Sequence, residues 1–299
     1  MLRGLRQVVD PANLTAIVNT GDDLVLHGLH ISPDLDTITY TLADQVNPET
    51  GWGLAGETWQ AMDSLERYGG VSWFRLGDLD LGTHLYRTQR LSEGASLTEV
   101  TAEITQAWGL ELAMLPMTND RVETRVTLAP HGDEPGGTEI SFQEYFVQRQ
   151  HSVPVQSVRF AGAEASAPGP EVLSAIAGAE RVVIAPSNPL VSIDPVLAVP
   201  GIRSAIEARR DDVVAISPII AGAALKGPAD RLLTELGHDA SVTGIAALYK
   251  DLARVLVLDT ADAELVGAVR DAGMEAVATE SVMKTPAIAA ALAQTVLDC

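Results

Sequence analysis

The second half of the chain alternates short apolar segments with amphipathic ones, and this alternation constrains the fold more than any other feature. The apolar segments have the length and the Val/Ile content of buried strands, and the amphipathic segments have helical spacing. Such a pattern is typical of βαβ units, whose mostly parallel sheet carries helices on both faces. The predicted strands are residues 155–160, 181–184, 213–216 and 255–258, and the predicted helices lie around residues 170–178, 200–209, 229–236, 243–252, 262–272 and 286–297.

The first half of the chain follows a less regular pattern. Residues 2–9 have helical spacing, residues 15–18 form a short apolar strand, and a helix is predicted to begin after Pro33. Further on, helices are predicted at 57–68, at 80–91 and after the capping-box pair Ser96 and Glu99. A hairpin then follows, with strands at 122–128 and 139–147 around a Gly/Pro-rich turn at 130–137.

We therefore expect an α/β fold with a single transferase domain over residues 1–299. Residues 1–44 and 151–299 would form a Rossmann-like core, a mostly parallel sheet with helices on both faces. Residues 45–150 interrupt the βα pattern, and we expect them to form a helical and β-hairpin insertion that covers the sheet edge.

The formal net charge of −20 limits the partners of the chain. A surface this acidic repels nucleic acid and anionic membranes. No apolar run approaches the roughly 20 residues of a membrane span, and the first ten residues are too short and too charged for a secretory signal. The single cysteine, Cys299, fits a reducing compartment and excludes internal disulfides. We expect a cytoplasmic protein without nucleic-acid or membrane partners.

Four aspartates lie within fifteen residues after the predicted strand at 15–18. Asp22 and Asp23 follow a polar turn, and Asp34 and Asp36 lie two residues apart at the start of a predicted helix. An α/β protein builds its site at the carboxyl ends of its strands. A single Asp at a helix start is more simply a cap, but four are hard to explain as caps. We take Asp23, Asp34 and Asp36 as candidate metal ligands, and Asp34 and Asp36 as candidate catalytic residues.

Two loops that directly follow predicted strands carry Ser and Asn. Ser187 and Asn188 follow the strand at 181–184, and Ser217 follows the strand at 213–216. Hydroxyl, amide and backbone N–H groups at such positions suit phosphate or nucleotide, although Ser-Asn-Pro is also common turn chemistry. A diphosphate facing clustered carboxylates needs a hard cation between them. Mg²⁺ held by one or two Asp and by the substrate phosphates is the expected arrangement.

Arg75 is one of few cations near the acidic cluster in the sequence. It lies beside Trp73 and Phe74, where a guanidinium can stack on or bridge to a planar anionic ligand, although a lone Arg is usually a surface residue. His84 is a candidate ligand, but a satisfied core histidine is the simpler interpretation. The sequence has no dinucleotide-binding, P-loop, zinc-protease or serine-hydrolase motif, which removes the main support for those enzyme classes.

Six segments, in order along the chain, carry a resemblance to a known family: VNTGDDLVLHGLHISPDLDT, WFRLGDLDLGTHLYRT, LPMTNDRVETRV, FQEYFV, IAPSNPLVSIDPVLAVPGIR and AISPIIAGAALKGPAD. Together they resemble the 2-phospho-L-lactate transferase family of coenzyme F-420 biosynthesis. The resemblance implies a Rossmann-like fold and dependence on Mg²⁺. It also implies transfer of a phospholactyl or phosphoenolpyruvyl group from a guanosine diphosphate-linked donor to the terminal hydroxyl of the deazaflavin Fo (7,8-didemethyl-8-hydroxy-5-deazariboflavin), with release of GMP.

The resemblance also implies roles for individual residues. Asp36 in SPDLDT and Arg75 in WFRLGD match the family's Fo-contacting residues, and Ser187, Asn188 and Ser217 lie in the loops assigned to the guanine nucleotide. Family members begin with a strand and a Gly-rich turn before the LRGL helix, whereas this chain starts inside that helix. We therefore expect the full-length protein to be the transferase and this form to be impaired in binding the donor diphosphate.

Other functions remain open at this point. A non-catalytic nucleotide- or flavin-binding α/β protein would bind both ligands without releasing GMP. A sugar-nucleotide transferase would need an aromatic platform for the sugar, which is hard to build with 4% aromatic residues. Many α/β enzymes pair through helices, so a homodimer is a further hypothesis. A composition rich in Ala, Asp and Arg and poor in Lys favours a high-GC bacterium, in which we expect the enolpyruvyl donor.

Overall fold

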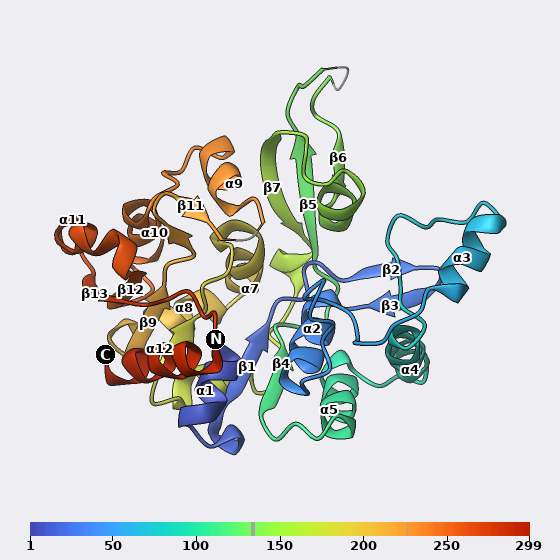
Figure 1. Ribbon diagram of the computed structural model, residues 1–299, viewed down its shortest axis with the longest axis horizontal. Coiled ribbons are helices and arrows are strands. Elements are labelled where there is room, and N and C mark those ends of the chain that lie inside the picture. The colour runs from blue at the N-terminus through green and yellow to red at the C-terminus, as the bar shows by residue number, and fades with distance from the viewer. Residues whose placement is uncertain (133–134, 226) are drawn as a thin grey trace.

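A parallel four-stranded sheet forms the main body of the protein, with strand order β13-β12-β9-β8. The computed structural model describes residues 1–132, 135–225 and 227–299 (Figure 1). The predicted α/β class is confirmed, and three predicted strands lie in this sheet. Its strands are β8 (Val182–Ile184), β9 (Val213–Ile216), β12 (Val255–Asp259) and β13 (Glu275–Thr279).

Helices cover both faces of this sheet because successive residues of each strand point to opposite sides. On one face, Val214 packs with Leu292 of the last helix; on the other, Val213 belongs to the large core together with Ile245. The helices are α1 (Leu2–Val8), α2 (Pro33–Leu42), α3 (Gln60–Arg67), α4 (Asp80–Ser92), α5 (Leu97–Ala107), α6 (Val172–Gly178), α7 (Asp194–Ala198), α8 (Ile202–Glu207), α9 (Ala229–Glu235), α10 (Val242–Tyr249), α11 (Val266–Asp271) and α12 (Pro286–Asp298).

A second parallel pair, β1 (Thr15–Val18) and β4 (Ala113–Pro116), carries the turn that follows the predicted first strand. β1 confirms its prediction, and α2 begins at Pro33 as expected. β4 was not predicted, because four residues ending in proline give almost no strand signal. It lies inside the segment predicted as an insertion, yet it supplies the partner of β1. The division into a core and an insertion stays a prediction.

A three-stranded antiparallel sheet, with order β6-β5-β7, projects at the top of Figure 1. Its strands are β5 (Glu123–Leu128), β6 (Glu139–Ser141) and β7 (Val155–Ala161). The prediction that residues 155–160 open the parallel sheet is wrong, because β7 pairs antiparallel with β5. This strand interleaves Gln, Ser and Arg with its apolar residues, which is the pattern of a half-exposed antiparallel strand and not of a buried parallel one.

The second strand of the predicted hairpin is also shorter than expected. β6 ends at Ser141, and Glu144–Gln148 form a π-helical turn in place of the strand predicted to reach residue 147. Tyr145 is fully buried in this turn. Residues 133–134 of the predicted turn lie outside the described residues.

Two short hairpins complete the fold. β2 (Leu24–Leu26) and β3 (Leu29–Ile31) are joined by His27 and Gly28, whose φ angles of 55° and 78° are those of a tight hairpin turn. This hairpin leads toward the arm that carries α3 (Figure 1). β10 (Ile219–Ile220) and β11 (Ala223–Ala224) form the other. Within the described part of the chain, no helix combines the length and apolar character needed to cross a membrane.

Candidate functional site

The turn after β1 is held by a hydrogen bond within the turn and by another from Gln143. Asn19 Oδ1 accepts from the Gly21 amide at 2.7 Å, and Gln143 Nε2 donates to the Asp22 carbonyl at 3.0 Å. A Cβ atom at Gly21 would lie 2.8 Å from Thr124 Oγ1 and 3.0 Å from Asn19 Oδ1, so only glycine fits. The two aspartates that follow are therefore fixed in place by their backbone.

Asp22 and Asp34 form a carboxylate pair bridged by one amide. Asn19 Nδ2 donates to Asp22 Oδ2 at 3.1 Å and to Asp34 Oδ2 at 3.2 Å. Burial, and then the nearby charge of Asp34, raise the pKa of Asp22 well above its usual range. Burial raises the pKa of Asp34 to about 6. Within the described residues neither carboxylate forms an ion pair with a cationic side chain. The pair is therefore an uncompensated site for positive charge.

The Asp22–Asp34 pair opens into a cavity of about 470 Å³, which we call the Asp34 cavity. The same cavity is lined by Ser187, Asn188 and Ser217, so the structure brings the three predicted nucleotide residues together with Asp34. Asn188 Oδ1 accepts from the Leu190 amide at 3.0 Å, and Ser217 Oγ donates to the Ile219 carbonyl at 2.8 Å. Both side chains thus also form the local hydrogen bonds of a turn, which was the alternative interpretation of these residues in the sequence.

An aromatic pair lines the Asp34 cavity as well. Phe142 and Phe146 are stacked, with ring centroids 5.4 Å apart and planes 17° from parallel. Both come from the segment between β6 and β7, and Phe146 is 37% exposed. A cavity with carboxylates and hydroxyls on its loops and a phenyl surface on one wall can take a ligand that combines phosphates with a planar ring.

Asp36 points away from this cavity and is neutralised by Arg87. Arg87 Nη1 donates to Asp36 Oδ2 at 3.1 Å, and Nη2 donates to Asp36 Oδ1. Both residues are buried, and Arg87 is only 2% exposed. His84 Nδ1 lies 3.7 Å from Asp36 Oδ2. Sequence reasoning did not single out Arg87, because it is 51 residues from Asp36 and nothing in its local pattern distinguishes it from a surface arginine.

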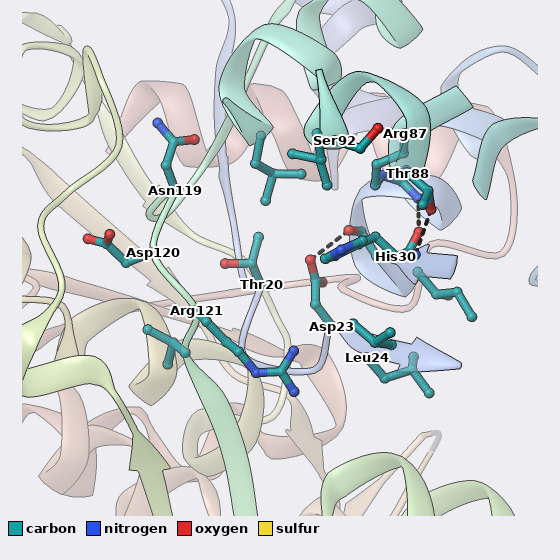
Figure 2. A pocket seen from close by; sticks show the side chains of 16 residues that line it. Thr20, Asp23, Leu24, His30, Arg87, Thr88, Ser92, Asn119, Asp120 and Arg121 are labelled. Carbon is teal, nitrogen blue, oxygen red and sulfur yellow. Dashed lines mark hydrogen bonds between the residues drawn. The ribbon is translucent and has the colours of Figure 1, made fainter. Parts of the chain in front are cut away.

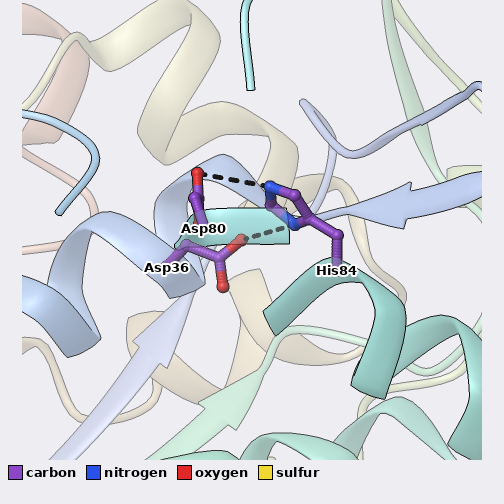
Figure 3. A group of neighbouring side chains, drawn as sticks. All are labelled: Asp36, Asp80 and His84. Carbon is purple, nitrogen blue, oxygen red and sulfur yellow. Dashed lines mark ion pairs between the residues drawn. The ribbon is translucent and has the colours of Figure 1, made fainter. Parts of the chain in front are cut away.

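Asp36, Asp80 and His84 offer three ligand atoms within 4.8 Å of one another, so this group can hold a metal ion (Figure 3). His84 Nε2 lies 3.3 Å from Asp80 Oδ2. Two features make it a poor site for Mg²⁺: one ligand is an imidazole, and the Arg87 guanidinium already occupies both Asp36 oxygens. His84 is buried between Asp36 and Asp80, but its Nε2 atom has no hydrogen-bond partner among the described residues, so the interpretation as a satisfied core histidine stays a prediction.

Asp23 faces a second cavity of about 360 Å³ on the other side of the turn (Figure 2). We call it the Arg87 cavity, because Arg87 lines it together with Thr20, His30 and Arg121. Ser32 Oγ donates to Asp23 Oδ2 at 2.6 Å. Burial, opposed by this hydrogen bond, raises the pKa of Asp23 well above its usual range. Consecutive aspartates thus face two different cavities.

Arg75 lies in the loop between α3 and α4. Its guanidinium is 2.5 Å from Asp63 Oδ1 and stacks over the Trp59 ring at 5.4 Å from the centroid. The side chain is 40% exposed, and Arg75 is not among the lining residues of either cavity. The structure therefore does not bring Arg75 together with Asp34 or with the Ser187 and Ser217 loops.

Fold and site together define an α/β protein with a carboxylate pair and hydroxyl-bearing loops at the carboxyl ends of parallel strands, a layout suited to phosphorylated small molecules. The profile of the family described as 2-phospho-L-lactate transferase CofD matches residues 1–296. The chain belongs to this family, and it is accordingly a transferase.

The relatives of the chain agree with this assignment. A protein from Kitasatospora aureofaciens named phosphoenolpyruvate transferase is 44% identical over 299 residues, covering 99% of this chain and 92% of the relative. A protein of the same name from Streptomyces coelicolor is 44% identical over 91% of this chain and 85% of its own length. A crystal structure of a UPF0052-family protein from Bacillus halodurans is 17% identical, with a TM-score of 0.60 over 99% of this chain and 94% of that one. It supports the fold alone.

Proposed function

We propose that this protein transfers a phosphoenolpyruvyl or phospholactyl group from a guanosine diphosphate-linked donor to the terminal hydroxyl of the deazaflavin Fo, releasing GMP, in coenzyme F-420 biosynthesis. The observation that carries the proposal is that the uncompensated Asp22–Asp34 pair opens into the same cavity as the Ser187, Asn188 and Ser217 loops. The family and the names of its relatives supply the substrate class. Those names favour the enolpyruvyl donor.

The donor would bind in the Asp34 cavity. Backbone amides and hydroxyls of the loops at Ser187 and Ser217 would bind the nucleotide, and its diphosphate would lie toward Asp22 and Asp34. A carboxylate pair repels phosphate oxygens unless a cation lies between them. The site therefore requires a cation that binds carboxylates and phosphates at once.

Mg²⁺ fits this donor set, and we propose that Asp22 and Asp34 hold it. Both offer hard oxygen ligands on a cavity wall, where substrate phosphates and water can complete the coordination shell. When bound, the ion neutralises the charge that develops on the diphosphate. Asp23 and Asp36 were predicted as further ligands, but Asp23 faces the other cavity and Asp36 is paired with Arg87. We therefore propose Asp22 in their place.

The reaction is a displacement at phosphorus. The acceptor hydroxyl oxygen forms a bond to the phosphorus that carries the lactyl or enolpyruvyl C2 oxygen. The bond from that phosphorus to the bridging oxygen breaks, GMP leaves with the bridging oxygen, and the hydroxyl proton passes to water. Little covalent work is left to the protein in such transfers, so positioning and charge neutralisation dominate. Asp34 would act directly in this step, whereas Asp36 would act through Arg87 by fixing α2 against α4.

Asp36 and Arg75 were predicted to contact Fo, and this part of the proposal has its own test. Fo binding is measured by fluorescence titration, with and without Mg²⁺, for the wild type and for Asp36→Ala and Arg75→Ala. Saturable binding that both variants lose supports the two contacts. Binding that persists in a folded Arg75→Ala protein removes Arg75 from the acceptor site, and persistence in folded Asp36→Ala does the same for Asp36.

The function itself is tested by incubating the protein with Fo, the GDP-linked donor and Mg²⁺ while GMP and the phosphorylated deazaflavin are measured by chromatography. We expect both products in equal amounts, and neither without Mg²⁺. Binding of donor and Fo without GMP release would instead support the non-catalytic alternative. We also propose a cytoplasmic location and a homodimer, the second of which light scattering after size exclusion will test.

A further inference from the structure

The Arg87 cavity is the part of the site to which the proposed reaction has assigned no ligand. Three buried polar atoms at this cavity have no hydrogen-bond partner among the described residues: Arg87 Nε, Thr20 Oγ1 and Asp23 Oδ1. Thr20 is 4% exposed and Arg87 2%. A buried polar atom without a hydrogen-bond partner is unfavourable, because it has lost its hydration and gained nothing in return. Three of them at one cavity indicate that a polar ligand completes the site.

Two guanidinium groups, those of Arg87 and Arg121, line the cavity together with the carboxyl groups of Asp23 and Asp120. The Arg121 side chain is 62% exposed and makes one long contact, 3.4 Å, with Glu123, so its guanidinium is available to a ligand. Figure 2 shows this side chain extending toward Asp23, with His30 and Arg87 beyond. His30, Arg87 and Arg121 line the same cavity. Burial, and then the charges of Arg121 and Arg87, lower the pKa of His30.

The two carboxylates that line the cavity each accept a hydrogen bond through one oxygen, and Asp23 Oδ1 stays without a partner among the described residues. Asp120 Oδ2 accepts from the Ala167 amide at 2.8 Å, and Asp23 Oδ2 accepts from Ser32. The lining residues include no Phe, Tyr or Trp within the described parts of the chain, so the stacked aromatic surface needed by a planar ring belongs to the Asp34 cavity. The Arg87 cavity is thus matched to a small anion.

The position of the cavity identifies which anion this is. Asp22 faces the Asp34 cavity and Asp23 faces the Arg87 cavity, and a trans peptide separates their Cα atoms by only about 3.8 Å. In both phospholactate and phosphoenolpyruvate, a carboxylate is attached to the carbon that bears the phosphate oxygen. With the phosphorus at the Asp22–Asp34 pair, that carboxylate lies within reach of the other side of the turn.

We propose that the Arg87 cavity binds the carboxylate of the transferred group, with Arg87 Nε, the Arg121 guanidinium and the Thr20 hydroxyl as its donors. Charge-assisted bonds from guanidinium to carboxylate are among the stronger hydrogen bonds in proteins. This subsite would distinguish the phosphoenolpyruvyl or phospholactyl donor from plain GDP. The proposal rests on the function proposed above, because it takes the donor's carboxylate as its ligand.

The test compares two ligands that differ only in the transferred group. Dissociation constants for GDP and for phosphoenolpyruvyl-GDP are measured by calorimetry with Mg²⁺ and without acceptor. In Arg121→Gln we expect affinity for phosphoenolpyruvyl-GDP to fall on the order of tenfold or more, with affinity for GDP unchanged. Thr20→Val should give a smaller loss of the same kind. Arg203→Gln is the matched control, since Arg203 is also an exposed arginine with one long ion pair and lines neither of the two cavities.

Arg87 itself is a poor first variant, because its loss leaves Asp36 buried without a counter-charge. A donor analogue whose carboxylate is replaced by a carboxamide tests the same contact from the ligand side. It should bind the wild type and Arg121→Gln with similar affinity. If Arg121→Gln instead weakens binding of this analogue as much as it weakens binding of the natural donor, the carboxylate is not the group that Arg121 binds, and the proposal is overturned.

Two further outcomes would overturn the proposal. In the first, Arg121→Gln weakens GDP and donor equally, which is a general charge effect. In the second, it raises the KM for Fo and leaves donor affinity unchanged, which assigns the cavity to the acceptor. If the wild type forms no GMP and binds the donor no more tightly than GDP, the proposed function itself fails. If instead the wild type transfers the group normally, and Arg121→Gln does not change the difference in affinity between the donor and GDP, only the carboxylate subsite is disproved.

Discussion

Asp34 and Asp36 lie two residues apart in the first turn of α2, but their charges are compensated in opposite ways. Asp36 is paired with a buried arginine of the same chain, whereas Asp34 shares an amide with Asp22 and has no ion pair within the described residues. A carboxylate with its own counter-charge holds structure together; a buried carboxylate without one is prepared for a cation from solution. The comparison separates a structural acid from a ligand-binding acid without reference to sequence similarity.

The sharpest way to test this contrast is to remove the charge of Asp36. In Asp36→Asn the Arg87 guanidinium stays buried without its partner, and breaking such a pair costs about 3–5 kcal/mol. We expect the midpoint of urea unfolding to fall accordingly, with the m-value unchanged. Adding Arg87→Met should recover part of the loss. A stability within about 1 kcal/mol of wild type would show that the pair is not structural.

Removing the charge of Asp34 should have the opposite profile. Asp34→Asn loses a proposed metal ligand, so we expect the rate of GMP release to fall roughly 100-fold or more. Stability should stay the same or rise, because the repulsion from Asp22 is relieved. Thermal unfolding and initial rates measured on one preparation check both parts. Asp212→Asn, at an exposed aspartate paired with Arg209, serves as the control and should change neither.

The turn after β1, which carries Asp22 and Asp23, can be displaced by a single methyl group at Gly21. In Gly21→Ala the new Cβ would lie 2.8 Å from Thr124 Oγ1 and 3.2 Å from Pro195 Cβ. We expect a loss of about 1–3 kcal/mol in stability and a lower transfer rate, measured by denaturation and by GMP release. Gly267→Ala, where a Cβ meets nothing within 4 Å, should be neutral or slightly stabilising. Equal effects of the two substitutions would contradict the tight fit at Gly21.

The raised pKa of Asp34 predicts how Mg²⁺ binding depends on pH. Only the deprotonated carboxylate binds metal, and this pKa is about 6. We expect Mg²⁺ affinity to fall by about tenfold per pH unit below pH 6, and more steeply wherever Asp22, whose pKa is also raised, must lose a proton as well. Without metal, the contribution of Asp34 to stability is largest at low pH and is lost as the pH rises through 6, because its folded pKa lies above the unfolded value. The Mg²⁺-induced shift of the melting temperature, recorded from pH 5 to 8, checks both statements; in Asp34→Asn the pH dependence should flatten.

The smallest effect on stability is expected at Arg75. Its ion pair with Asp63 is half exposed, and exposed pairs contribute about 0–1 kcal/mol. Arg75→Ala should therefore unfold almost like the wild type. A weaker apparent affinity for Fo without a change in stability would agree with the acceptor contact implied by the family. A large loss of stability would instead give Arg75 a structural role in the arm.

Much of this architecture follows from local sequence signals. The parallel strands, the start of α2 at Pro33 and the capping box of Ser96 and Glu99 all depend on residues close together in the chain, and each is present. The pairing of β7 with β5 was missed because the composition of a strand does not determine which other strand it pairs with. β4 was missed because it is short and ends in proline.

The candidate site shows the same division. Clustered aspartates and the Ser and Asn loops are visible in the sequence, since they follow strand ends directly. Which aspartate faces which cavity depends on contacts between distant segments. Asp36 was expected beside the metal, but Arg87 of α4 neutralises it, and Asp22 was passed over although it shares an amide with Asp34. The periodicity of apolar residues predicts which face of a helix is buried, but it does not predict which residues of other segments pack against that face.

The packing of α1 against α12 has a consequence for synthesis on the ribosome. A Cβ at Gly4 would lie 2.1 Å from the Ala289 carbonyl oxygen, so the two helices are in backbone contact, and α12 also covers Val214 and Val257 of the sheet. These partners are separated by most of the chain, and such distant contacts slow folding. One apolar face of the sheet therefore stays uncovered until α12 has been synthesised, near the end of translation. During that interval the nascent chain is open to aggregation, and we expect its yield in cells to depend on chaperones and growth temperature.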